Sequence, residues 1–433
     1  MRVKGELFQI NRSLKLISNK IGLFQNVGKA SLFNSDPKII GYTSFNCNTV
    51  RLGAENYAGK SGGCGFEWEN SFLASIGEGV ERYCTVFYDL KKLKRGTFKG
   101  FKKGEATMPH KFALFHPNQY KKKGFPFAPF EEDTGLYWER VYDLIGNKYI
   151  YCPAIFVYMP FTSDERYISE QISTGFAAHS DYYKALLSGL YEVIERDSFM
   201  IAWTNLLDLP KIKIEGSLKK FVDTILPNHF ELHLFDMTTD IKVPSVFGIL
   251  KGKHDFGEFI AFSAATRFTY SEAVKKTILE LCQSVPYFRY LLPENKNKNF
   301  NDYGDLKSFE DHSVFYTKKK DHRNIFDKWL NKTPDLRIDF SEKNSLTAKG
   351  TIASIKKEFV KKNYQILVKD VTTFDVNKAG FKVVRVICPE LIHINGSYNS
   401  YYFGGKRLYD VPEKMGYNKK TYDELNFMPH PFP

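Results

Sequence analysis

The sequence predicts an α/β fold (mixed α+β), because strand-like and helix-like segments alternate along the chain. Short runs rich in apolar and aromatic residues, at 231–237, 243–251 and 258–263, are typical of strands. A longer run at 271–287, with apolar residues three and four positions apart, is typical of a helix. The chain has 433 residues, 43% of them hydrophobic, and no low-complexity linker. We therefore expect one domain over residues 1–433 with a large core.

The first half is expected to contain strands, two loops and two helices. Residues 1–57 alternate short apolar and polar pieces around turns, which favours strands that belong to the domain. A loop of small residues at 60–65 (KSGGCG) is expected to lead into a helix that contains 74–84. Two strands in a hairpin are expected within 136–161. A second small-residue loop at 173–180 (STGFAAHS) is expected to open the next helix.

The second half continues the alternation and ends in a proline-rich tail. After the strands at 231–263, a turn at 264–266 is expected to lead to the third helix. Residues 291–345 are polar and lysine-rich, and we expect them to be a long surface insertion with some helix of its own, such as Arg323–Leu330. Two more strands are expected within 364–388. The terminal residues 429–433 read PHPFP, and proline at alternate positions favours a stiff, extended segment.

Two of the predicted helices contain the same pattern, Glu-x-x-Glu-Arg, at 74–84 (ASIGEGVERYC) and at 189–199 (GLYEVIERDSF). Residues three positions apart lie on one face of a helix, so each pattern directs two carboxylates the same way. The third helix offers a glutamate and a glutamine at this spacing. The residues are Glu78 and Glu81, Glu192 and Glu195, and Glu280 and Gln283.

Three helices with paired oxygen ligands would suit Mg²⁺ ions that bind a polyphosphate, because magnesium prefers a few carboxylates plus substrate phosphates. Apolar neighbours such as Ile76 and Val80 indicate that Glu78 is partly buried, and buried carboxylates need metals, arginines or hydrogen bonds. Arg82 and Arg196 could supply the arginines. A buried salt-bridge network is therefore the alternative to a metal site.

Capping residues and glycines refine the two Glu-x-x-Glu-Arg helices. We expect Asn70 or Ser71 to cap the first helix and Asp181 to cap the second. Gly77 and Gly79 each cost the first helix about 1 kcal/mol relative to alanine. Their presence indicates that a ligand or a neighbouring backbone comes close, or that packing there is tight.

Composition excludes several classes of protein. The net charge of +13 comes from 62 Lys and Arg against 49 Asp and Glu, but the lysines are dispersed and no recognition motif accompanies them. We therefore expect no nucleic-acid partner. Six scattered cysteines without a C-x-x-C pair indicate reduced thiols rather than a disulfide framework or a zinc site. Without a signal-peptide core or a membrane-length apolar run, we expect a cytoplasmic protein with no membrane partner.

Common nucleotide-binding and catalytic motifs do not occur. The sequence has no Walker A loop, no G-x-G-x-x-G after a strand, no kinase H-R-D and no G-x-S-x-G. The tail offers a different possibility for chemistry. A stiff extended end could insert into a groove and present the α-carboxylate of Pro433 at a fixed point, whereas most chain ends are unstructured.

These segments resemble the YcaO superfamily of ATP-using enzymes. The resemblance rests on the two Glu-x-x-Glu-Arg helices in order, on SEAVKKTILELCQ and on the terminal PxPxP. FEDHSVFY (309–316), KDVTTFDVNKAGFKVVRVICPEL (369–391) and GGKRL (404–408) agree with it. It runs from about residue 40 to the end. The chain is most similar to the stand-alone D proteins of thiazole/oxazole-modified peptide clusters, the streptolysin S type among them.

The resemblance implies binding of ATP and Mg²⁺ without a P-loop. The implied metal ligands are Glu78, Glu81, Glu192, Glu195 and Glu280. The implied nucleotide-binding residues are Ser75, Glu78, Glu81, Arg82, Glu192, Glu195 and Gln283, and the implied catalytic residues are Pro433 and Arg196. Two departures affect this set. Ala74 stands where many members have serine, and Lys184 stands where an acid is expected in many relatives.

The implied activity is an ATP-dependent cyclodehydratase. A Cys, Ser or Thr side chain of a ribosomal precursor peptide adds to the preceding amide carbonyl, and ATP phosphorylates the resulting oxyanion. Loss of phosphate then leaves a thiazoline or an oxazoline. The Pro433 carboxylate is a candidate base for proton removal.

The implied partners are the precursor peptide and a separate leader-binding protein (a C protein, E1-like), because the first 60 residues do not resemble a peptide clamp. A flavin dehydrogenase (a B protein) is expected to oxidise the azolines, and a homodimer is possible. Two alternatives stay open. One is a YcaO-type enzyme that forms thioamides, and the other is an ATP-binding scaffold without turnover.

Overall fold

Three antiparallel sheets form the framework of the computed structural model, which describes residues 2–55, 57 and 59–432. The first sheet has the order β1 (Phe24–Lys29), β2 (Ile40–Asn46), β3 (Lys60–Gly65). The second has the order β10 (Gly257–Thr266), β9 (Ser245–His254), β8 (Phe230–Asp236). The third contains β4 (Lys94–Gly96), β5 (Leu136–Asp143), β11 (Leu367–Asp370), β12 (Lys382–Ile387) and β7 (Phe176–His179) in that order, with β6 (Lys148–Pro153) paired to β5.

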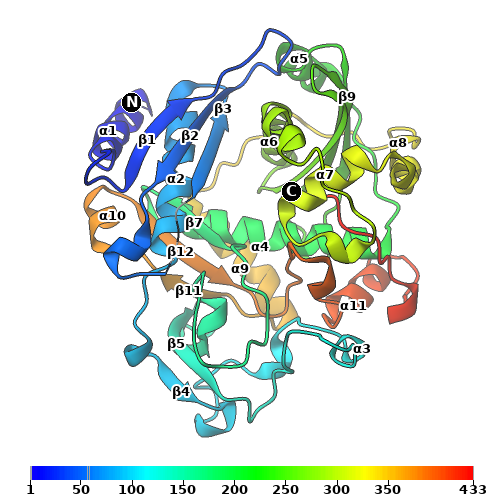
Figure 1. The fold of residues 1–433 in the computed structure, drawn as a ribbon. Coiled ribbons are helices and arrows are strands. Elements are labelled where there is room, and N and C mark those ends of the chain that lie inside the picture. The colour runs from blue at the N-terminus through cyan, green and yellow to red at the C-terminus, as the bar shows by residue number, and fades with distance from the viewer. Residues whose placement is uncertain (1, 56, 58, 433) are drawn as a thin grey trace.

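Three long helices join these sheets: α2 (Trp68–Cys84), α4 (Tyr182–Asn205) and α6 (Tyr270–Glu294). Each begins a short turn after the strand before it, β3, β7 or β10. Each also packs on two sheets. Helix α2 contacts the first and third sheets, α4 the third and second, and α6 the second and first. Figure 1 shows α4 across the middle of the molecule, between the upper sheets and the lower one.

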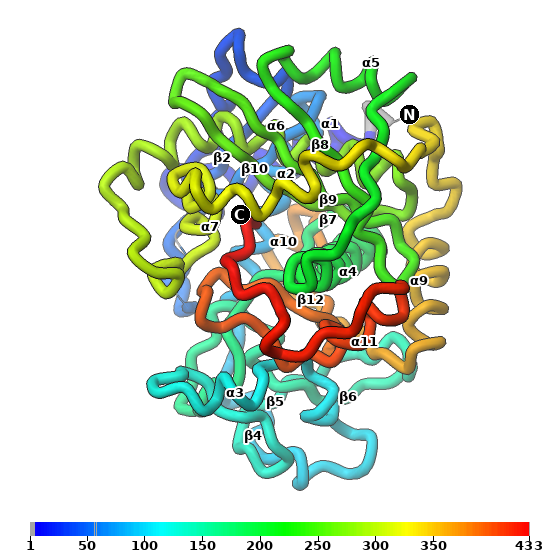
Figure 2. Tube along the Cα trace, turned by 90° about the vertical axis from the view of Figure 1, so that its right-hand side faces the viewer, coloured from blue at the N-terminus to red at the C-terminus, as the bar shows by residue number. Residues whose placement is uncertain are grey.

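The remaining helices surround this framework. They are α1 (Arg2–Leu14), α3 (Pro117–Tyr120), α5 (Gly216–Ile225), α7 (Phe309–Lys318), α8 (Asp327–Leu330), α9 (Ala348–Lys362), α10 (Phe374–Lys378) and α11 (Arg407–Lys414). Helix α7 packs on β10 and α6, and α11 packs on α4. The C-terminal segment runs from α11 towards α7, where the described chain ends (Figure 2). No helix in the described part of the chain is both long and apolar enough to cross a membrane.

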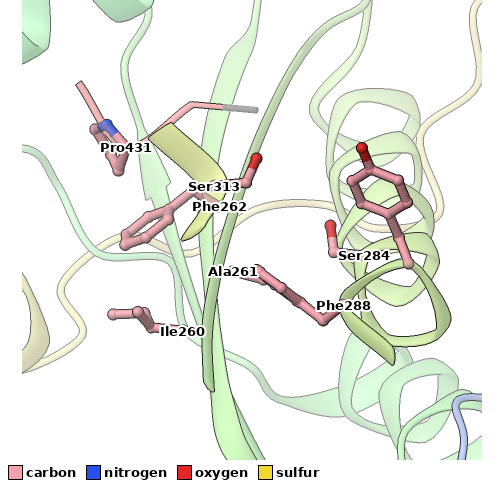
Figure 3. A pocket seen from close by; sticks show the side chains of 8 residues that line it. Ile260, Ala261, Phe262, Ser284, Phe288, Ser313 and Pro431 are labelled. Carbon is pink, nitrogen blue, oxygen red and sulfur yellow. The ribbon is translucent and has the colours of Figure 1, made fainter. Parts of the chain in front are cut away.

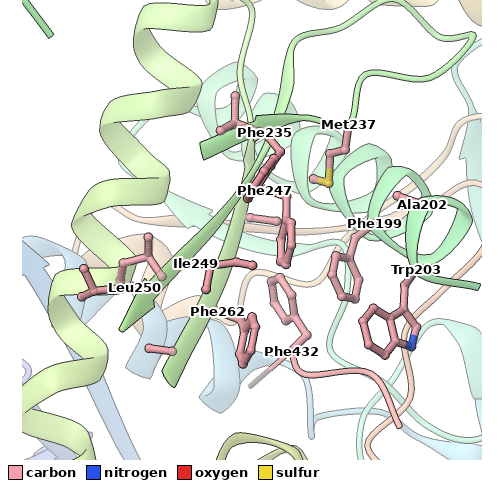
Figure 4. Close-up of a cluster of buried hydrophobic side chains, with 14 of the residues drawn as sticks. Phe199, Ala202, Trp203, Phe235, Met237, Phe247, Ile249, Leu250, Phe262 and Phe432 are labelled. Atoms are coloured by element: carbon pink, nitrogen blue, oxygen red, sulfur yellow. The ribbon is translucent and has the colours of Figure 1, made fainter. Parts of the chain in front are cut away.

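The largest part of the core lies between the second sheet and helices α4, α6 and α7. Its aromatic side chains include Phe199 and Trp203 of α4 and Phe247 and Phe262 of the sheet, all at most 3% exposed (Figure 4). Phe432, from the tail, joins this group. Because burying a side chain of this size contributes about 2–3 kcal/mol, this cluster fixes α4 against the second sheet.

The mixed α and β fold is confirmed, as are the strands expected within 136–161, 231–263 and 364–388, although the second hairpin strand, β6, ends at Pro153 and not at Phe161. The expectation of strands throughout residues 1–57 was wrong for residues 2–14. Helix α1 forms there because its buried side chains, Gln9, Ile10 and Ser13, recur at helical spacing.

Both small-residue loops contain strands, which is a further difference from the expectation. The whole of 60–65 is β3, and part of 173–180 is β7. Glycine is needed in β3 because α2 lies almost on its backbone. A Cβ at Gly63 would be 2.1 Å from the Ser75 nitrogen. Residues 264–266, expected to be a turn, are the last residues of β10.

The segment 291–345 is not only a surface insertion. It begins inside α6 and contains α7 and α8, and several of its aromatic residues are buried in the largest core cluster. Tyr316 and Phe326, for example, are completely buried. The high lysine content of this segment led to the prediction of a surface insertion, although its aromatic residues are buried.

The first acid helix starts earlier than expected. Its N-cap is Glu67, not Asn70 or Ser71. The Ser71 hydroxyl donates back to the Glu67 carbonyl at 2.7 Å, a bond made within the first turn. Asp181 does cap α4, as expected.

Candidate active site

One carboxylate on each of the three long helices is oriented by the same kind of hydrogen bond. In every case a glutamate accepts a hydrogen bond from a donor 16 or 17 residues earlier, in or near the preceding strand. The pairs are Gly62 N to Glu78 Oε2 (2.8 Å), Gly175 N to Glu192 Oε2 (2.9 Å) and Ser263 Oγ to Glu280 Oε2 (2.7 Å). One oxygen of each carboxylate is thus oriented by the fold.

The carboxylates of α2 and α4 lie close enough to influence each other. Burial raises the pKa of Glu81 well above its ordinary value. Arg82 opposes this shift, while the charges of Glu192 and Glu78 raise the pKa further. Burial also raises the pKa of Glu78, with Glu192 adding to the effect. The acid pairs predicted on the two helices therefore meet at one site.

The carboxylates of α4 and α6 meet in the same way. Burial raises the pKa of Glu195, and the charges of Glu280 and Glu192 add to it, against the opposing charge of Arg196. Glu195 Oε2 accepts from the Thr266 backbone at 3.1 Å. Burial alone would raise the pKa of Glu280 as well, but Lys276 lowers it. All five predicted acids thus belong to one electrostatic cluster.

The arginine of each Glu-x-x-Glu-Arg motif pairs with both of its carboxylates, but loosely. The distances are 3.9 Å from Arg82 to Glu78 and to Glu81, 3.6 Å from Arg196 to Glu192, and 3.5 Å from Arg196 to Glu195. These exceed the length of a good N–H···O hydrogen bond. The buried Nη1 of Arg196 has no hydrogen-bond partner.

A second arginine–carboxylate group on α4 shows what a closed network looks like. Arg407 lies 2.6 Å from Asp197 and 2.8 Å from Asp240, and Arg407 and Asp197 are at most 3% exposed. By contrast, the side chains of Glu78 and Glu192 are 39% and 29% exposed. The acid cluster therefore keeps accessible oxygens that its own arginines leave free, which disfavours a closed salt-bridge network.

This donor set fits magnesium and phosphate. Arg82, Arg196 and Lys276 pair with the five carboxylates, yet burial still raises the pKa values of Glu78, Glu81 and Glu195, so a divalent cation would favour the charged forms of these acids. In the described part of the chain, no three His, Cys, Asp or Glu side chains are grouped tightly enough to hold one ion. Magnesium is usually held by one or two carboxylates, with phosphate oxygens and water completing its shell, so this spacing suits it.

One face of α2 is open beside the acids. Residues 74, 77, 78 and 81 share this face because they are three or four positions apart. Ala74 is exposed, and a Cβ built on Gly77 would meet nothing within 4 Å. Ala74 and Gly77 thus leave free space next to Glu78 and Glu81, and alanine at position 74 enlarges it relative to serine.

The two other predicted nucleotide ligands have partners within the protein. The hydroxyl of Ser75 is buried and donates to the Ser61 carbonyl at 3.4 Å. Gln283 accepts from the Cys64 thiol at 3.0 Å. Gln283 therefore lies beside β3, the strand whose Gly62 N–H orients Glu78. A contact of either residue with a nucleotide stays a prediction.

A family model described as YcaO cyclodehydratase, binding ATP and Mg²⁺, matches residues 62–392 of the chain. The chain belongs to the YcaO family. The matched residues include all five acids of the cluster and both motif arginines. A search of curated proteins found no match.

Solved structures share the fold at low sequence identity. A heterocyclase in complex with substrate and cofactor has a TM-score of 0.77 at 21% identity and aligns with 99% of this chain. This YcaO protein covers 57% of that heterocyclase, so it spans just over half of its length. YcaO from Methanopyrus kandleri, bound with AMPPCP and Mg²⁺, has a TM-score of 0.62 at 16% identity, covering 90% of this chain and 91% of its own. The E. coli microcin synthetase McbBCD complex matches with a TM-score of 0.59 at 14% identity, over 87% and 91%.

The proline tail of this YcaO protein reaches the acid cluster through Phe432. The Arg196 guanidinium lies over the Phe432 ring, 4.1 Å from its centre, and Phe432 is 3% exposed. Pro433, the predicted base, lies outside the described residues. Lys184 is exposed in the first turn of α4, two turns before Glu192. Its consequence for metal binding stays a prediction.

Sequence reasoning missed two cations of the site. Lys276 lies one turn before Glu280 on α6 and pairs with it at 3.0 Å. The sequence already indicates this pair, because residues four positions apart are neighbours on a helix. Arg385 lies buried in β12, and burial lowers its pKa to about 10 against the charges of Glu192 and Glu81. The signal was an arginine inside an apolar strand, KVVRVI, because a buried arginine needs a reason to be there.

Proposed function

We propose that this protein is an ATP-dependent cyclodehydratase that converts Cys, Ser or Thr residues of a ribosomal precursor peptide to thiazolines or oxazolines. One observation carries the proposal. Carboxylates from three helices converge at a single site, where burial raises the pKa values of Glu78, Glu81 and Glu195 and the motif arginines of α2 and α4 pair with the acids only loosely. Such a cluster suits a metal-bound polyphosphate better than it suits a structural role. The description of the matching family model supports the same reaction.

The acid cluster would hold the Mg²⁺ ions, whose positive charge would neutralise the phosphates during transfer. The ligands that we propose are Glu78, Glu81, Glu192, Glu195 and Glu280. Backbone N–H groups orient Glu78 and Glu192, so these two need little reorganisation on binding. Ser75, Arg82 and Gln283 would complete the nucleotide site, with Arg196 close to the reacting groups.

In this reaction the peptide loses the atoms of one water molecule for each ring that forms. The thiol or hydroxyl adds to the preceding carbonyl carbon and loses its proton, and the carbonyl oxygen becomes an oxyanion. This oxyanion attacks the γ-phosphorus of ATP, and ADP leaves. The amide N–H then loses its proton while the C–O bond to phosphate breaks, and the C=N bond of the ring forms. We propose the Pro433 carboxylate as the acceptor of a proton.

The partners that we propose are the precursor peptide, a leader-binding C protein (E1-like) and a flavin-dependent B protein. A substrate-bound heterocyclase and the multi-protein McbBCD complex among the structural neighbours support a peptide substrate and partner proteins. We further propose that the protein works in the cytoplasm as one domain and as a homodimer. The six free thiols support the cytoplasmic location.

The test is the mass of a Cys/Ser/Thr-rich precursor peptide incubated with this protein, Mg-ATP and the partner protein. Stepwise loss of water with matching phosphate release is expected. Glu192→Gln should abolish it, while Glu413→Gln, an exposed control on α11, should not. A product that gains sulfur would indicate thioamide formation instead. Bound ATP without any phosphate release, with all partners present, would indicate a scaffold and refute the proposal.

A further inference from the structure

The last residues of the chain are held through their backbone carbonyls. Four successive carbonyls each accept from a different side chain. The donors are Tyr398 to Phe427 O (2.6 Å), Trp203 to Met428 O (3.1 Å), Tyr316 to Pro429 O (2.6 Å) and His312 to His430 O (2.7 Å). This arrangement suits a proline-rich segment, because proline has no N–H and only its carbonyl can be bound.

The two donors nearest the end come from one helix. His312 and Tyr316 are one turn apart on α7, so both side chains lie on the face that meets the tail. Both are completely buried. Both ring nitrogens of His312 face carbonyl oxygens, Nδ1 that of His430 at 2.7 Å and Nε2 that of Gly396 at 3.2 Å, and the shorter contact favours the tautomer that donates through Nδ1. The His312 ring also stacks on the His430 ring at 3.9 Å.

The tail packs closely against its neighbours and leaves little empty space beside it. A cavity of about 10 Å³, enough for roughly one water molecule, remains beside Pro431 (Figure 3). Its other walls come from β10, α6 and α7 and include Phe262, Phe288 and Ser313. The tail therefore has little freedom to shift sideways once its carbonyls are bound.

Phe432, which follows the four bound carbonyls, contacts the acid site. The Phe432 ring packs on Phe199 at 4.9 Å (Figure 4). It also lies under the guanidinium of Arg196, 4.1 Å from ring centre to guanidinium. Arg196 in turn pairs with Glu192 and Glu195. A shift of the tail would therefore move the ring that supports the motif arginine of α4.

We propose that His312 and Tyr316 form a tail clamp that fixes Phe432 against Arg196 and so sets the geometry of the acid site for turnover. They are positioning residues, because they act through the tail rather than on substrate. Their effect on turnover rests on the proposed function. The clamp itself does not, because the seating of the tail can be measured without any substrate.

The central test compares Tyr316→Phe with Tyr409→Phe. Both remove a hydroxyl that donates to a backbone carbonyl at 2.6 Å, but Tyr409 bonds to Phe403, upstream of the tail. Hydrogen exchange of the C-terminal peptide reports seating, because the His430 N–H donates to the Tyr401 hydroxyl at 3.0 Å. Tyr316→Phe should speed this exchange and lower kcat by about tenfold, with KM for ATP unchanged. Tyr409→Phe should leave all three as in the parent.

A second pair tests the histidine. His312→Asn retains a donor close to the position of Nδ1, whereas His312→Leu removes it at similar volume. The asparagine variant should recover at least part of the protection and the kcat that the leucine variant loses. Tail exchange in Tyr316→Phe equal to that in Tyr409→Phe would refute the clamp. A released tail with unchanged kcat would refute the positioning role. A parent protein inactive on every peptide would count against the proposed function alone, and exchange would still decide the clamp.

Discussion

The two glycines that flank Glu78 on α2 should respond to alanine with opposite signs. A Cβ at Gly77 would meet nothing within 4 Å, so the change adds a methyl group to open space. A Cβ at Gly79 would lie 2.2 Å from a ring carbon of Phe24 and 3.1 Å from Asn46 Oδ1. The Phe24 ring is fully buried and cannot move aside freely. Gly79 is thus explained by packing, whereas Gly77 is not.

The magnitudes follow from these contacts. Alanine stabilises a helix interior by about 1 kcal/mol relative to glycine, so Gly77→Ala should raise the free energy of unfolding by up to that amount. At Gly79 the same gain is opposed by overpacking, which typically costs about 1–3 kcal/mol. With a contact as short as 2.2 Å the upper end applies, and a net loss of about 1–2 kcal/mol is expected.

The assay is denaturant unfolding of both variants without ligand, followed by a titration with Mg-ATP. If ligand occupies the space beside Gly77, the more stable Gly77→Ala variant should bind ATP more weakly than the parent. Reduced stability of Gly77→Ala, or equal effects at the two positions, would refute the packing argument. Unchanged ATP affinity in a stabilised Gly77→Ala would show that the open face of α2 does not face the nucleotide.

Three further predictions concern charges and the chain end. The raised pKa of Glu195 means that its ionisation costs stability, so the stability it contributes is lost as pH rises through that raised pKa. Glu195→Gln should therefore gain thermal stability over the parent at alkaline pH but lose the stabilisation by Mg-ATP; a variant less stable than the parent at alkaline pH would contradict the charge argument. Asp197→Ala should destabilise by about 3 kcal/mol, the lower end for a broken buried pair, because buried Arg407 loses one of its two carboxylates and keeps Asp240, whereas Glu192→Ala, on the same helix, should cost far less in denaturant unfolding. Equal losses would mean that both acids are structural. Adding a few residues after Pro433 should abolish turnover and spare ATP binding by calorimetry, and full activity of the extended protein would eliminate the carboxylate as the base.

The acids of the site were predictable, but their meeting point was not. The i, i+3 spacing within one helix fixes the common direction of Glu78 and Glu81, and this is a local property. Their proximity to Glu192 depends on how α2 and α4 cross the third sheet, which no local pattern encodes. The glycine-rich β3 was mistaken for a loop for a related reason. Glycine is required in β3 because α2 approaches its backbone closely, and this tertiary contact overrides the weak strand propensity of glycine.

The arrangement of the framework explains why the site needs the whole chain. Each acid helix packs on two of the three sheets, and together the helices bridge every pair of sheets. The carboxylates of the three helices therefore meet between the sheets. Burial raises the pKa values of Glu81 and Glu195, and the charges of the neighbouring carboxylates add to this, so their mutual repulsion acts to push the helices apart. A ligand that neutralises this charge would contact α2, α4 and α6 at once and would hold the three sheets together. Ligand binding should thus stabilise regions far from the acids, because it offsets a repulsion shared by all three layers.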